Sequence, residues 1–313
     1  MNSPDTNRAH YPHRPIATLD ALARHLGVQT AILRELAAAP AQGYTTPFKI
    51  PKKSGGYRTV MAPKAPLKRL QTRVLRKLLS RAIYPAYLQG GARSDAIAQR
   101  GAEANARVHL RCALLINVDV RAFFPCVSAA LVRQVWLQLF RCSPEVAACL
   151  TALTTLDGAL PQGAPTSAAL ANLVLFDQEP TLVQTLGEMG FQYTRYIDDI
   201  SVSTRSRVSA NHTEHVITLV AGMLAKHGLR IAREKLQIAS RQERQLVTGH
   251  IVNRRLAIPR LERAKVRAAF LQDQRTITPA TPMSSTCATA GRVAYVRRLH
   301  PRWIERLAFS VPH

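Results

Sequence analysis

A largely apolar run at residues 113–120, ALLINVDV, constrains the fold of this chain most strongly, because a run of that length is typical of a strand buried on both faces. Helical patterns surround it, and residues 66–79 repeat leucine and valine at helical spacing. Two more strand-like runs, 191–197 and 200–203, meet at Asp198-Asp199 and form a candidate hairpin. The alternation of helix and strand patterns predicts a mixed fold, either α/β or α+β.

Three aspartates interrupt these apolar segments: Asp119 lies inside the first run, and Asp198 and Asp199 lie between the other two. A carboxylate in such surroundings costs several kcal/mol unless a cation meets it. Mg²⁺ would meet it, because this ion binds one or two carboxylates together with substrate phosphates, and a pair of such ions can stabilise both oxygens of a phosphoryl transfer. The bend of a hairpin tip would let Asp198 and Asp199 approach one site.

A purely structural interpretation of these aspartates is also open. Asp is a common turn former, so Asp198 and Asp199 would only close the hairpin. Asp119 would then pair with Arg121 or Arg195. The other motifs of the chain decide between the two interpretations.

The charge of the chain indicates a polyanionic partner. It has 43 Lys and Arg residues against 19 Asp and Glu residues, a net charge of +24, whereas solubility needs a net charge of roughly 2 to 8 on a small domain. A membrane surface fits less well, because the sequence has neither an apolar run of about 18 residues nor a polybasic amphipathic helix. Nucleic acid is therefore the predicted partner, and no membrane association is expected.

The cysteines and the N-terminus indicate the compartment. An odd number of cysteines without CxxC spacing argues against a disulfide framework and a zinc ribbon. We expect small buried hydrophobic side chains at Cys112, Cys126, Cys142, Cys149 and Cys287. Residues 1–15 are polar, lack the apolar core of a signal peptide, and are expected to be disordered. These features predict a cytoplasmic protein.

Three motifs, in their order along the chain, carry a resemblance to the reverse transcriptase family. Residues 117–124 (NVDVRAFF) resemble its first carboxylate motif, 160–167 (LPQGAPTS) its PQG motif and 196–199 (YIDD) its YxDD box. The resemblance implies an RNA-directed DNA polymerase of α+β class with the right-hand polymerase fold. Such a fold has fingers, a palm of antiparallel sheet packed on helices, and a small helical thumb.

The same resemblance divides the chain into parts. It implies an N-terminal helical extension at residues 1–40 and fingers at 41–110, which include the inserted region with an NAxxH signature. The palm with the catalytic carboxylates would span 111–245, and its helix at 160–185 would be shared with the fingers. A primer-grip-like hairpin and a basic helical thumb would follow at 246–313.

By this resemblance Asp119, Asp198 and Asp199 are the catalytic carboxylates. They would bind two Mg²⁺ ions, for which Mn²⁺ could substitute, and the carbonyl of Val120 would assist them. Phe124 would lie under the sugar of the incoming nucleotide and reject a ribose 2′-OH by its bulk. The resemblance therefore makes the three carboxylates part of a site that adds nucleotides.

Further side chains would bind the incoming dNTP. Residues 49–58 resemble the fingers segment that grips the triphosphate, which needs several cationic donors. The candidates in this segment are Lys52, Lys53 and Arg58, and a solvated basic loop is the alternative interpretation. Gln162 and Gly163 would line the nascent base pair, where glycine permits close backbone approach. Lys235 would approach the pyrophosphate leaving group.

Two further matches resemble the bacterial retron enzymes. Residues 105–109 (NARVH) fit their NAxxH signature, and 247–249 (VTG) fit the triplet that precedes their thumb. This resemblance implies a cognate structured noncoding RNA, priming from the 2′-OH of an internal guanosine, and a branched RNA–DNA product, msDNA. It also implies a separate effector protein and a role in anti-phage defence. The implied RNA-binding residues are Asn105, His109, Val247, Thr248 and Gly249.

The C-terminal segment is a candidate RNA-recognition thumb. A polar stretch at 276–290, expected to be a loop, separates its two basic helical patterns. Arginines of this segment would contact RNA phosphates, although a solvated helix face is the alternative for each of them. The candidates are Arg297, Arg298, Arg302 and Arg306.

Two other functions stay open. Another bacterial reverse transcriptase, such as a diversity-generating, abortive-infection or group II intron-like enzyme, shares the carboxylate motifs but uses different RNAs or primers. A noncatalytic RNA-binding protein that retains a polymerase fold is the second alternative. The intact Asp119, Asp198 and Asp199 argue against it.

Overall fold

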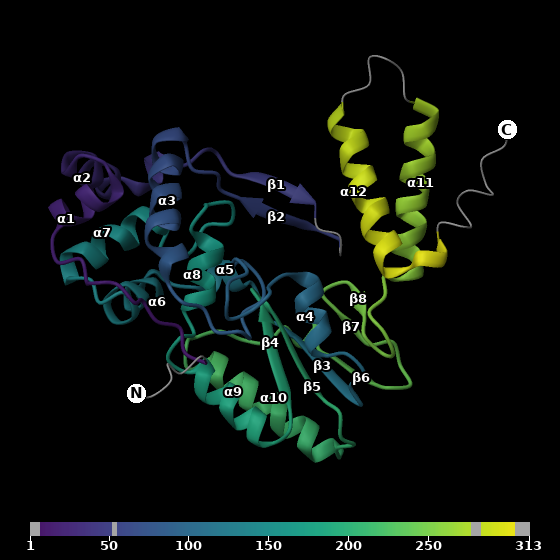
Figure 1. Ribbon diagram of the computed structural model, residues 1–313. Helices are drawn as coiled ribbons and strands as arrows, with labels where there is room; N and C mark the ends of the chain where they lie inside the picture. The colour runs from purple at the N-terminus through teal and green to yellow at the C-terminus, as the bar shows by residue number, and fades with distance from the viewer. Residues whose placement is uncertain (1–6, 52–54, 277–282, 304–313) are drawn as a thin grey trace.

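A four-stranded sheet lies at the centre of the computed structural model, which describes residues 7–51, 55–276 and 283–303 (Figure 1). Helices cover this sheet, and two C-terminal helices, α11 (Arg260–Thr276) and α12 (Met283–Leu299), stand side by side at one edge of the molecule. No described helix is long and apolar enough to cross a lipid bilayer. The combination of helices with an antiparallel sheet confirms the predicted α+β class.

The central sheet has the strand order β4-β5-β3-β6, and every neighbouring pair is antiparallel. Its strands are β3 (Leu114–Asp119), β4 (Gln192–Tyr196), β5 (Asp199–Thr204) and β6 (Gln237–Ser240). The apolar run of the sequence is β3, which lies between two neighbours and whose Leu115, Ile116 and Val118 are at most 1% exposed. Because both faces of this strand are covered, the run is apolar instead of alternating.

The two faces of the sheet differ in chemistry. Ile116, Val118, Ile200 and Val202 belong to the main hydrophobic core, together with residues of α9 (Glu179–Glu188) and α10 (Ala210–Ala225), and these two helices lie along this face (Figure 1). The opposite face carries polar side chains, which are those of Asn117, Thr194, Ser201 and Ser203. Strand alternation thus separates an apolar, helix-covered face from a polar face.

The N-terminal helices pack against one another and against helices from later in the chain. The N-terminal helices are α1 (Leu19–Leu26), α2 (Thr30–Ala38) and α3 (Ala65–Lys77), and the later helix that they contact is α7 (Pro144–Thr154). The side chain of Thr18 caps α1 by accepting from the amide of Ala21 at 3.2 Å, and Gly27 ends the helix with a φ of +73°. Leu22 and Leu26 of α1 are fully buried, as their helical spacing predicts.

The polar N-terminal segment is more ordered than its composition predicts. His10 exchanges two backbone hydrogen bonds with Ile83, at 3.2 and 2.9 Å. The ring of Tyr11 is 6% exposed and lies 4.6 Å from that of Phe140. Arg141 also donates to the carbonyls of Tyr11 and His13, at 3.0 and 2.7 Å. The expectation of disorder at 1–15 is therefore wrong for this part, because these contacts tie the polar segment to the rest of the fold. Residues 1–6 lie outside the described residues.

A second, two-stranded sheet projects from the body as a hairpin of β1 (Phe48–Pro51) and β2 (Tyr57–Val60). Short extended runs at 44–50 and 57–61, joined by a stretch that contains Gly55 and Gly56, are the sequence pattern of such a hairpin. Directly after β2, the amide of Met61 donates to the carbonyl of Gln162 at 2.8 Å. The base of the hairpin is thereby joined to the PQG segment, which lies about a hundred residues further along the chain.

The C-terminal region begins with the hairpin of β7 (Leu246–Val247) and β8 (His250–Ile251) and continues into α11 and α12. The prediction of a loop at 276–290 is wrong from Met283 onward, where α12 begins. This segment is rich in Ser, Thr and Ala but contains no proline after Pro282, so packing of the backbone along α11 can override its weak helical preference.

The remaining elements are short helices and helical turns that connect these layers. They are η1 (Pro40–Gly43), η2 (Leu79–Arg81), α4 (Ala102–Val108), α5 (Phe123–Cys126), α6 (Ala129–Gln134), the π-helix η3 (Val135–Leu139), α8 (Ser167–Leu173), η4 (Arg233–Lys235) and η5 (Pro301–Trp303). Of the cysteines, Cys112, Cys142 and Cys149 are buried as expected, whereas Cys126 is exposed at the end of α5. The side chain of Cys287 lies outside the described residues.

Candidate active site

Strand pairing brings three aspartates together at one end of the central sheet. β3 ends at Asp119, β5 begins at Asp199, and the antiparallel register places these two residues opposite each other. The amide of Val120 donates to the carbonyl of Asp198 at 3.0 Å, which fixes the third aspartate beside the end of β3. Residues that are separated by about eighty positions in the sequence thus share one small region.

The turn that presents Asp198 has a strained backbone. β4 ends at Tyr196 and β5 begins at Asp199, so that only Ile197 and Asp198 connect the two strands. Ile197 has a φ of +62°, a left-handed conformation that β-branched residues rarely adopt. Gly90 packs under this turn, and a Cβ there would lie 2.8 Å from the ring of Tyr196. The surrounding structure therefore imposes the turn, which the intrinsic preference of Ile197 disfavours.

The three carboxylates differ in their pKa shifts and in their partners. Burial, opposed in part by hydrogen bonding, raises the pKa of Asp198. Burial, reinforced by Asp198 and Asp119, raises the pKa of Asp199 to about 6. Asp119 instead accepts hydrogen bonds from Nζ of Lys235 at 2.9 and 3.0 Å, and this contact raises the pKa of Lys235. The site therefore holds more negative charge than its own lysine neutralises.

The donor set suits a hard divalent cation. Within residues 7–51, 55–276 and 283–303, Asp198 and Asp199 form no ion pair. The same part of the chain contains no group of three acidic, histidine or cysteine side chains close enough to hold a metal ion alone. Mg²⁺ takes oxygen ligands and is commonly bound by one or two carboxylates that act with substrate phosphates. Asp198, which is half-buried, and Asp199, which is exposed, lie beside Asp119 without an ion-pair partner in the described chain and fit that requirement.

The alternative pairing of Asp119 with Arg195 is wrong. The guanidinium of Arg195 instead binds the carboxylate of Glu179, with Nε at 2.6 Å and Nη2 at 2.8 Å from its two oxygens. Within the described chain, the one ion pair that Asp119 forms is with Lys235. Arg195 is a charged residue within a strand pattern of the sequence. Strand alternation directs its side chain to the sheet face opposite those of Asp119 and Asp199.

Two adjacent aromatic residues follow Asp119 and have different environments. Ala122 has a φ of +46° and starts the short helix α5. Phe123 is 2% exposed and belongs to the core, whereas Phe124 is half-buried, and their ring centroids are 6.1 Å apart. Phe124 is therefore the one of the pair with ring surface available for a ligand.

The PQG segment is held close to the base of the β1–β2 hairpin. Gly163 has a φ of +113°, and a Cβ at this position would lie 2.7 Å from Cγ1 of Val60 and 3.2 Å from the carbonyl oxygen of Met61. Gln162, whose carbonyl accepts from Met61, keeps a half-buried side chain. Glycine is thus required at 163 both by backbone conformation and by the close approach of the neighbouring strand.

Of the three predicted triphosphate ligands, the structure describes Arg58 alone. Lys52 and Lys53 lie outside the described residues. Arg58 lies in β2 opposite Ile50, and its side chain is exposed. Its exposure leaves the guanidinium accessible to a phosphate, and the dNTP contact stays a prediction.

His109 of the NAxxH signature is locked onto the polar face of the central sheet. The side chain is 1% exposed, with Nδ1 2.7 Å from Oγ of Ser203 and Nε2 2.7 Å from Oγ1 of Thr194. Burial lowers the pKa of His109 to about 4, so that the ring is neutral near pH 7. The histidine therefore fastens the end of α4 across β4 and β5.

The VTG triplet forms the turn between β7 and β8, and this turn contacts the start of α4. Thr248 and Gly249 have φ values of +42° and +81°, as a two-residue hairpin turn requires. The hydroxyl of Thr248 donates to the carbonyl of Ala102 at 2.6 Å, and Nδ2 of Asn105 donates to that hydroxyl at 3.5 Å. Val247 is 1% exposed. Two signatures separated by 143 positions thus form one unit.

This unit also contacts the C-terminal helices. Glu103 of α4 binds Arg298 of α12, with Nη1 of the arginine 3.1 Å from Oε1, and also binds Arg107. The guanidinium of Arg298 lies 5.3 Å from the ring centroid of Tyr295, whose hydroxyl contacts Nε2 of His250. Helix α4 is therefore joined to the sheet, to the β7–β8 hairpin and to α12, and we call these contacts the α4 junction.

The predicted RNA-binding residues differ in exposure, and some of their side chains already bind protein groups. Asn105, His109 and Val247 are almost completely buried, and the polar side chains among them meet protein groups. Of the four thumb arginines, Arg297 and Arg298 are exposed on α12, whereas the side chain of Arg302 and all of Arg306 lie outside the described residues. An RNA contact by any of these side chains stays a prediction.

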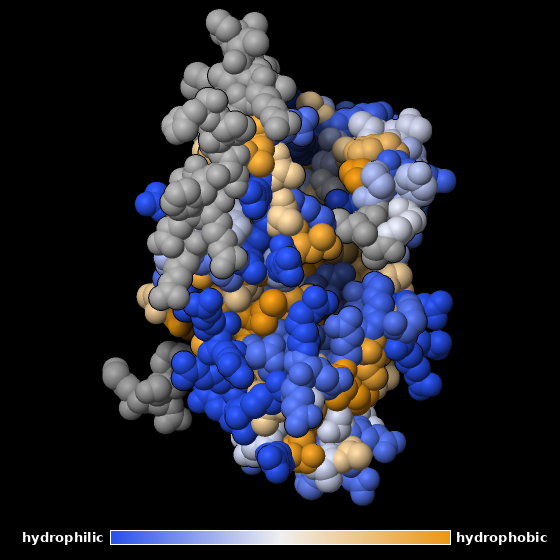
Figure 2. All heavy atoms as spheres, turned by 90° about the vertical axis from the view of Figure 1, so that its right-hand side faces the viewer, coloured by the Kyte–Doolittle hydropathy of each residue, from blue (hydrophilic) through white to orange (hydrophobic). Residues whose placement is uncertain are grey.

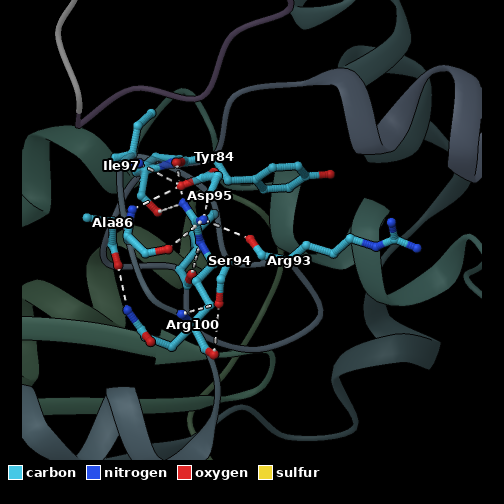
Figure 3. Close-up of polar contacts among 11 residues, drawn as sticks. Tyr84, Ala86, Arg93, Ser94, Asp95, Ile97 and Arg100 are labelled. Atoms are coloured by element: carbon cyan, nitrogen blue, oxygen red, sulfur yellow. Dashed lines mark hydrogen bonds and ion pairs between the residues drawn. The ribbon is translucent and has the colours of Figure 1, made fainter.

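A loop at residues 84–100 lies against the site and is closed by one arginine (Figure 3). The guanidinium of Arg100 donates to the carbonyls of Tyr84, Leu88 and Arg93 at 2.7, 3.0 and 2.9 Å and pairs with Asp95 at 2.7 Å. The same loop adds to the edge of β4, where backbone bonds join Tyr87 and Gln89 to Arg195. Sequence patterns gave no signal for this closure, because its acceptors are backbone carbonyls.

Known proteins similar to this chain are polymerases. The sequence profile of the family "Reverse transcriptase (RNA-dependent DNA polymerase)" matches residues 50–252. The retron Se72 reverse transcriptase of Salmonella heidelberg is 34% identical over 233 residues, which cover 74% of this chain and 60% of that protein. The retron Mx65 reverse transcriptase of Myxococcus xanthus is 33% identical over 313 residues, which cover 93% of this chain and 70% of that protein.

Among solved structures, an apo telomerase from Candida tropicalis, truncated from its C-terminal domain, has a TM-score of 0.44 to this chain. Its sequence identity is 12%, and the likeness covers 74% of this chain and 61% of that one. The match to the Se72 protein leaves more than a third of that relative's own length without a counterpart here.

Proposed function

Because the chain belongs to the reverse transcriptase family and is of the bacterial retron type, we propose that it is the RNA-directed DNA polymerase of a retron. The observation that carries this proposal is the convergence of Asp119, Asp198 and Asp199 at the end of the central sheet, with Lys235 beside them. Such an arrangement suits the transfer of a nucleotidyl group, in which negative charge gathers on phosphate oxygens.

The carboxylates would hold two divalent cations, Mg²⁺ or in its place Mn²⁺, with the carbonyl of Val120 as a further oxygen ligand. When bound, such ions lower the pKa of an attacking hydroxyl and neutralise charge on the phosphates. Asp198 and Asp199 would bind the cations in their deprotonated form. The raised pKa of each means that they lose their protons at a higher pH than an ordinary aspartate does. Lys235 would turn from Asp119 to the leaving pyrophosphate and donate a proton to it.

The incoming dNTP would lie between this site and the β1–β2 hairpin. Arg58, with Lys52 and Lys53, would bind the triphosphate, since a polyanion needs several cationic donors. The half-buried ring of Phe124 would exclude a ribose 2′-OH, and Gln162 and Gly163 would contact the nascent base pair. The hydrogen bond from Met61 to Gln162 supports this placement, because it holds the PQG segment against the base of the hairpin.

The polymer partner would be a cognate structured noncoding RNA. A net charge of +24 favours such a polyanion, and the face of the molecule that carries the C-terminal helices is largely hydrophilic (Figure 2). We assign the N-terminal extension to residues 1–40, fingers to 41–110, palm to 111–245, and hairpin and thumb to 246–313. Arg297 and Arg298 are the described thumb arginines that are accessible to RNA phosphates.

The product would be msDNA, a branched RNA–DNA molecule primed from the 2′-OH of an internal guanosine. Membership of the retron type supports this product, and with it a separate effector protein, a role in anti-phage defence and a cytoplasmic location. These parts of the proposal rest on that membership alone.

The test is to purify the protein from cells that also express its neighbouring noncoding RNA and to analyse the nucleic acid bound to it. We expect an RNA–DNA hybrid that is sensitive to RNase and to a debranching enzyme. The matched control is Asp198→Asn with Asp199→Asn, which should bring down the RNA without any DNA. Linear cDNA would contradict the retron proposal and favour another reverse transcriptase, and RNA alone with the wild-type protein would favour a noncatalytic RNA-binding function.

A further inference from the structure

We propose that Arg195, which lies on the sheet face opposite the catalytic carboxylates, is a positioning residue that sets the backbone of the Ile197-Asp198 turn. This inference rests on the proposed polymerase function, because it concerns the geometry of the metal-binding turn. Arg195 itself touches neither substrate nor ion in this scheme.

Every donor of the Arg195 guanidinium has a protein acceptor. The side chain is fully buried. Nε donates to Glu179 at 2.6 Å, Nη2 donates to Glu179 at 2.8 Å and to the carbonyl of Asn172 at 2.9 Å, and Nη1 donates to the carbonyls of Ala171 and Ile197 at 3.4 and 3.0 Å. A guanidinium has five N–H groups in a rigid planar fork, and here all five are used.

The bond to Ile197 acts at the strained residue of the turn. Ile197 has a φ of +62°, and its carbonyl precedes the amide of Asp198 in the same peptide unit. Holding that carbonyl fixes the orientation of the peptide that leads into Asp198. The carbonyl of Asp198 in turn accepts from the amide of Val120 at 3.0 Å, so that the orientation is passed on to the end of β3.

The other acceptors of the Arg195 guanidinium lie in or near two helices, α8 and α9. Ala171 and Asn172 belong to α8, the helix that follows the PQG segment, and Glu179 belongs to α9. Glu179 is 1% exposed and also accepts from the hydroxyl of Tyr193 at 2.7 Å. The backbone of Arg195 is clamped as well, because its amide and carbonyl bond to Tyr87 and Gln89.

Arg195 does more than neutralise Glu179, because it also binds backbone carbonyls of α8 and of the turn. An ion pair with Glu179 alone would use Nε and one Nη2 proton, whereas the remaining donors connect α8 to the catalytic turn. The distance between the PQG helix and Asp198 is therefore set through one side chain. Lysine cannot replace it, because a single ammonium cannot reach Glu179, Asn172 and Ile197 in one plane.

The experiment compares Arg195→Lys with Arg100→Lys in the full-length protein. Arg100 is a matched control, because its side chain is also fully buried, pairs with a carboxylate and binds backbone carbonyls (Figure 3). It closes the loop that packs against Arg195 and the turn but donates no hydrogen bond to the turn itself, so it tests loosening of the loop without loss of the bond to Ile197. The first readout is hydrogen exchange at the amide of Val120 without metal, since this amide is bound to Asp198. We expect exchange at least tenfold faster in Arg195→Lys and within about twofold of wild type in Arg100→Lys.

The second readout is the binding of Mn²⁺ alone, followed by electron paramagnetic resonance, and the third is steady-state dNTP incorporation. We expect Arg195→Lys to weaken Mn²⁺ binding about tenfold and to lower kcat at least tenfold, with KM for dNTP within about threefold of wild type. Arg100→Lys should leave all three values within about twofold, even where its melting temperature falls as much as that of Arg195→Lys.

The outcomes separate this inference from the proposed function. Unchanged Val120 exchange and Mn²⁺ binding in a folded Arg195→Lys protein would overturn the positioning role, and so would equal changes in both variants, which would indicate general loosening of the core. A wild-type protein that incorporates no dNTP would overturn the polymerase proposal, and the exchange measurement would still decide on Arg195. Should Arg195→Lys fail to fold, Glu179→Asp, which retracts the anchor by one methylene, is measured in its place with the same expected directions.

Discussion

Two acidic sites, one on the helix-covered face of the β4–β5 hairpin and one at its tip, differ in their partners. On the helix-covered face, Glu179 is 1% exposed and accepts from two nitrogens of Arg195 and from the hydroxyl of Tyr193. At the tip, Asp198 is half-buried and Asp199 is exposed; neither forms an ion pair within the described chain, and the pKa of each is raised. Glu179 thus has its counter-charge within the fold, whereas Asp198 and Asp199 have none, and it is the missing partner that marks the tip as a site for a ligand.

The first prediction concerns the unpaired site and has the largest expected effect. Asp198→Asn with Asp199→Asn should lower dNTP incorporation by about 1000-fold or more, because the divalent ions lose their ligands. Without metal, the melting temperature should stay the same or rise, since two crowded negative charges are removed. Incorporation and thermal unfolding in EDTA measure the two effects. A drop of several degrees in the melting temperature would contradict the view that these carboxylates destabilise the fold.

The second prediction concerns the paired site. Glu179→Gln leaves the guanidinium of Arg195 buried without a counter-charge, which should lower the free energy of unfolding by about 3–5 kcal/mol. Urea denaturation measures this loss. Glu262→Gln provides the control, because Glu262 contacts Lys265 on an exposed surface of α11, where loss of a pair changes stability by less than about 1 kcal/mol. If the two variants lose equal stability, the contrast between buried and exposed pairs does not hold here.

The third prediction uses pH to sharpen the comparison. Burial raises the pKa of Asp199 from 3.8 to about 6 in the folded protein, whereas the unfolded chain keeps a value of about 3.9. The folded state therefore favours the protonated acid. Its destabilising effect is absent below pH 4, grows as the pH rises, and is complete above pH 6, where it amounts to roughly 1 kcal/mol, because Asp199 is exposed and solvent screens its charge.

The measurement is unfolding by urea in EDTA at pH 4 to 8, for the wild type and for Asp199→Asn. The difference in free energy of unfolding between them should widen with rising pH and level off above pH 6. Groups such as His109, whose pKa burial lowers to about 4, cancel in this difference. A difference that is constant over the whole range would show that Asp199 titrates like an exposed carboxyl.

The fourth prediction has the smallest expected effect on stability and concerns Asp119, whose partner is replaceable. The side chain of Lys235 is 54% exposed, so Lys235→Met should change the free energy of unfolding by less than about 1 kcal/mol. Mn²⁺ alone should bind Asp119 more tightly in this variant, because a competing cation has been removed. Urea denaturation and a Mn²⁺ titration check these outcomes, and weaker Mn²⁺ binding would mean that Lys235 organises the site instead of competing for it.

The hairpin that carries Asp198-Asp199 could be predicted from local strand patterns, whereas the meeting of Asp119 with this hairpin is implied by the resemblance to reverse transcriptases. An apolar run that ends at Asp119 and a hairpin that carries Asp198-Asp199 leave few other ways to pair the strands. The register of the pairing, which sets Asp119 opposite Asp199, follows from which residues of β3 and β5 must be buried.

The α4 junction could not be predicted in the same way. Asn105 and Thr248 are 143 positions apart, and neither residue type specifies a partner at such a distance. The sequence leaves open a pairing of Arg195 with Asp119, because it does not show that Glu179 lies nearer to Arg195 than Asp119 does. The N-terminal segment and the start of α12 were also misjudged, since tertiary packing there outweighs a polar composition.

The α4 junction bears on how such a protein can be recombined. An engineer who exchanges α11 and α12 for those of a relative, in order to change which RNA is recognised, would cut the chain near Pro259 and leave α4 behind. The incoming helix would then have to present an arginine to Glu103 and a tyrosine to His250. Chimaeras that transplant residues 102–109 together with the C-terminal helices should therefore retain activity more often than those that transplant the helices alone.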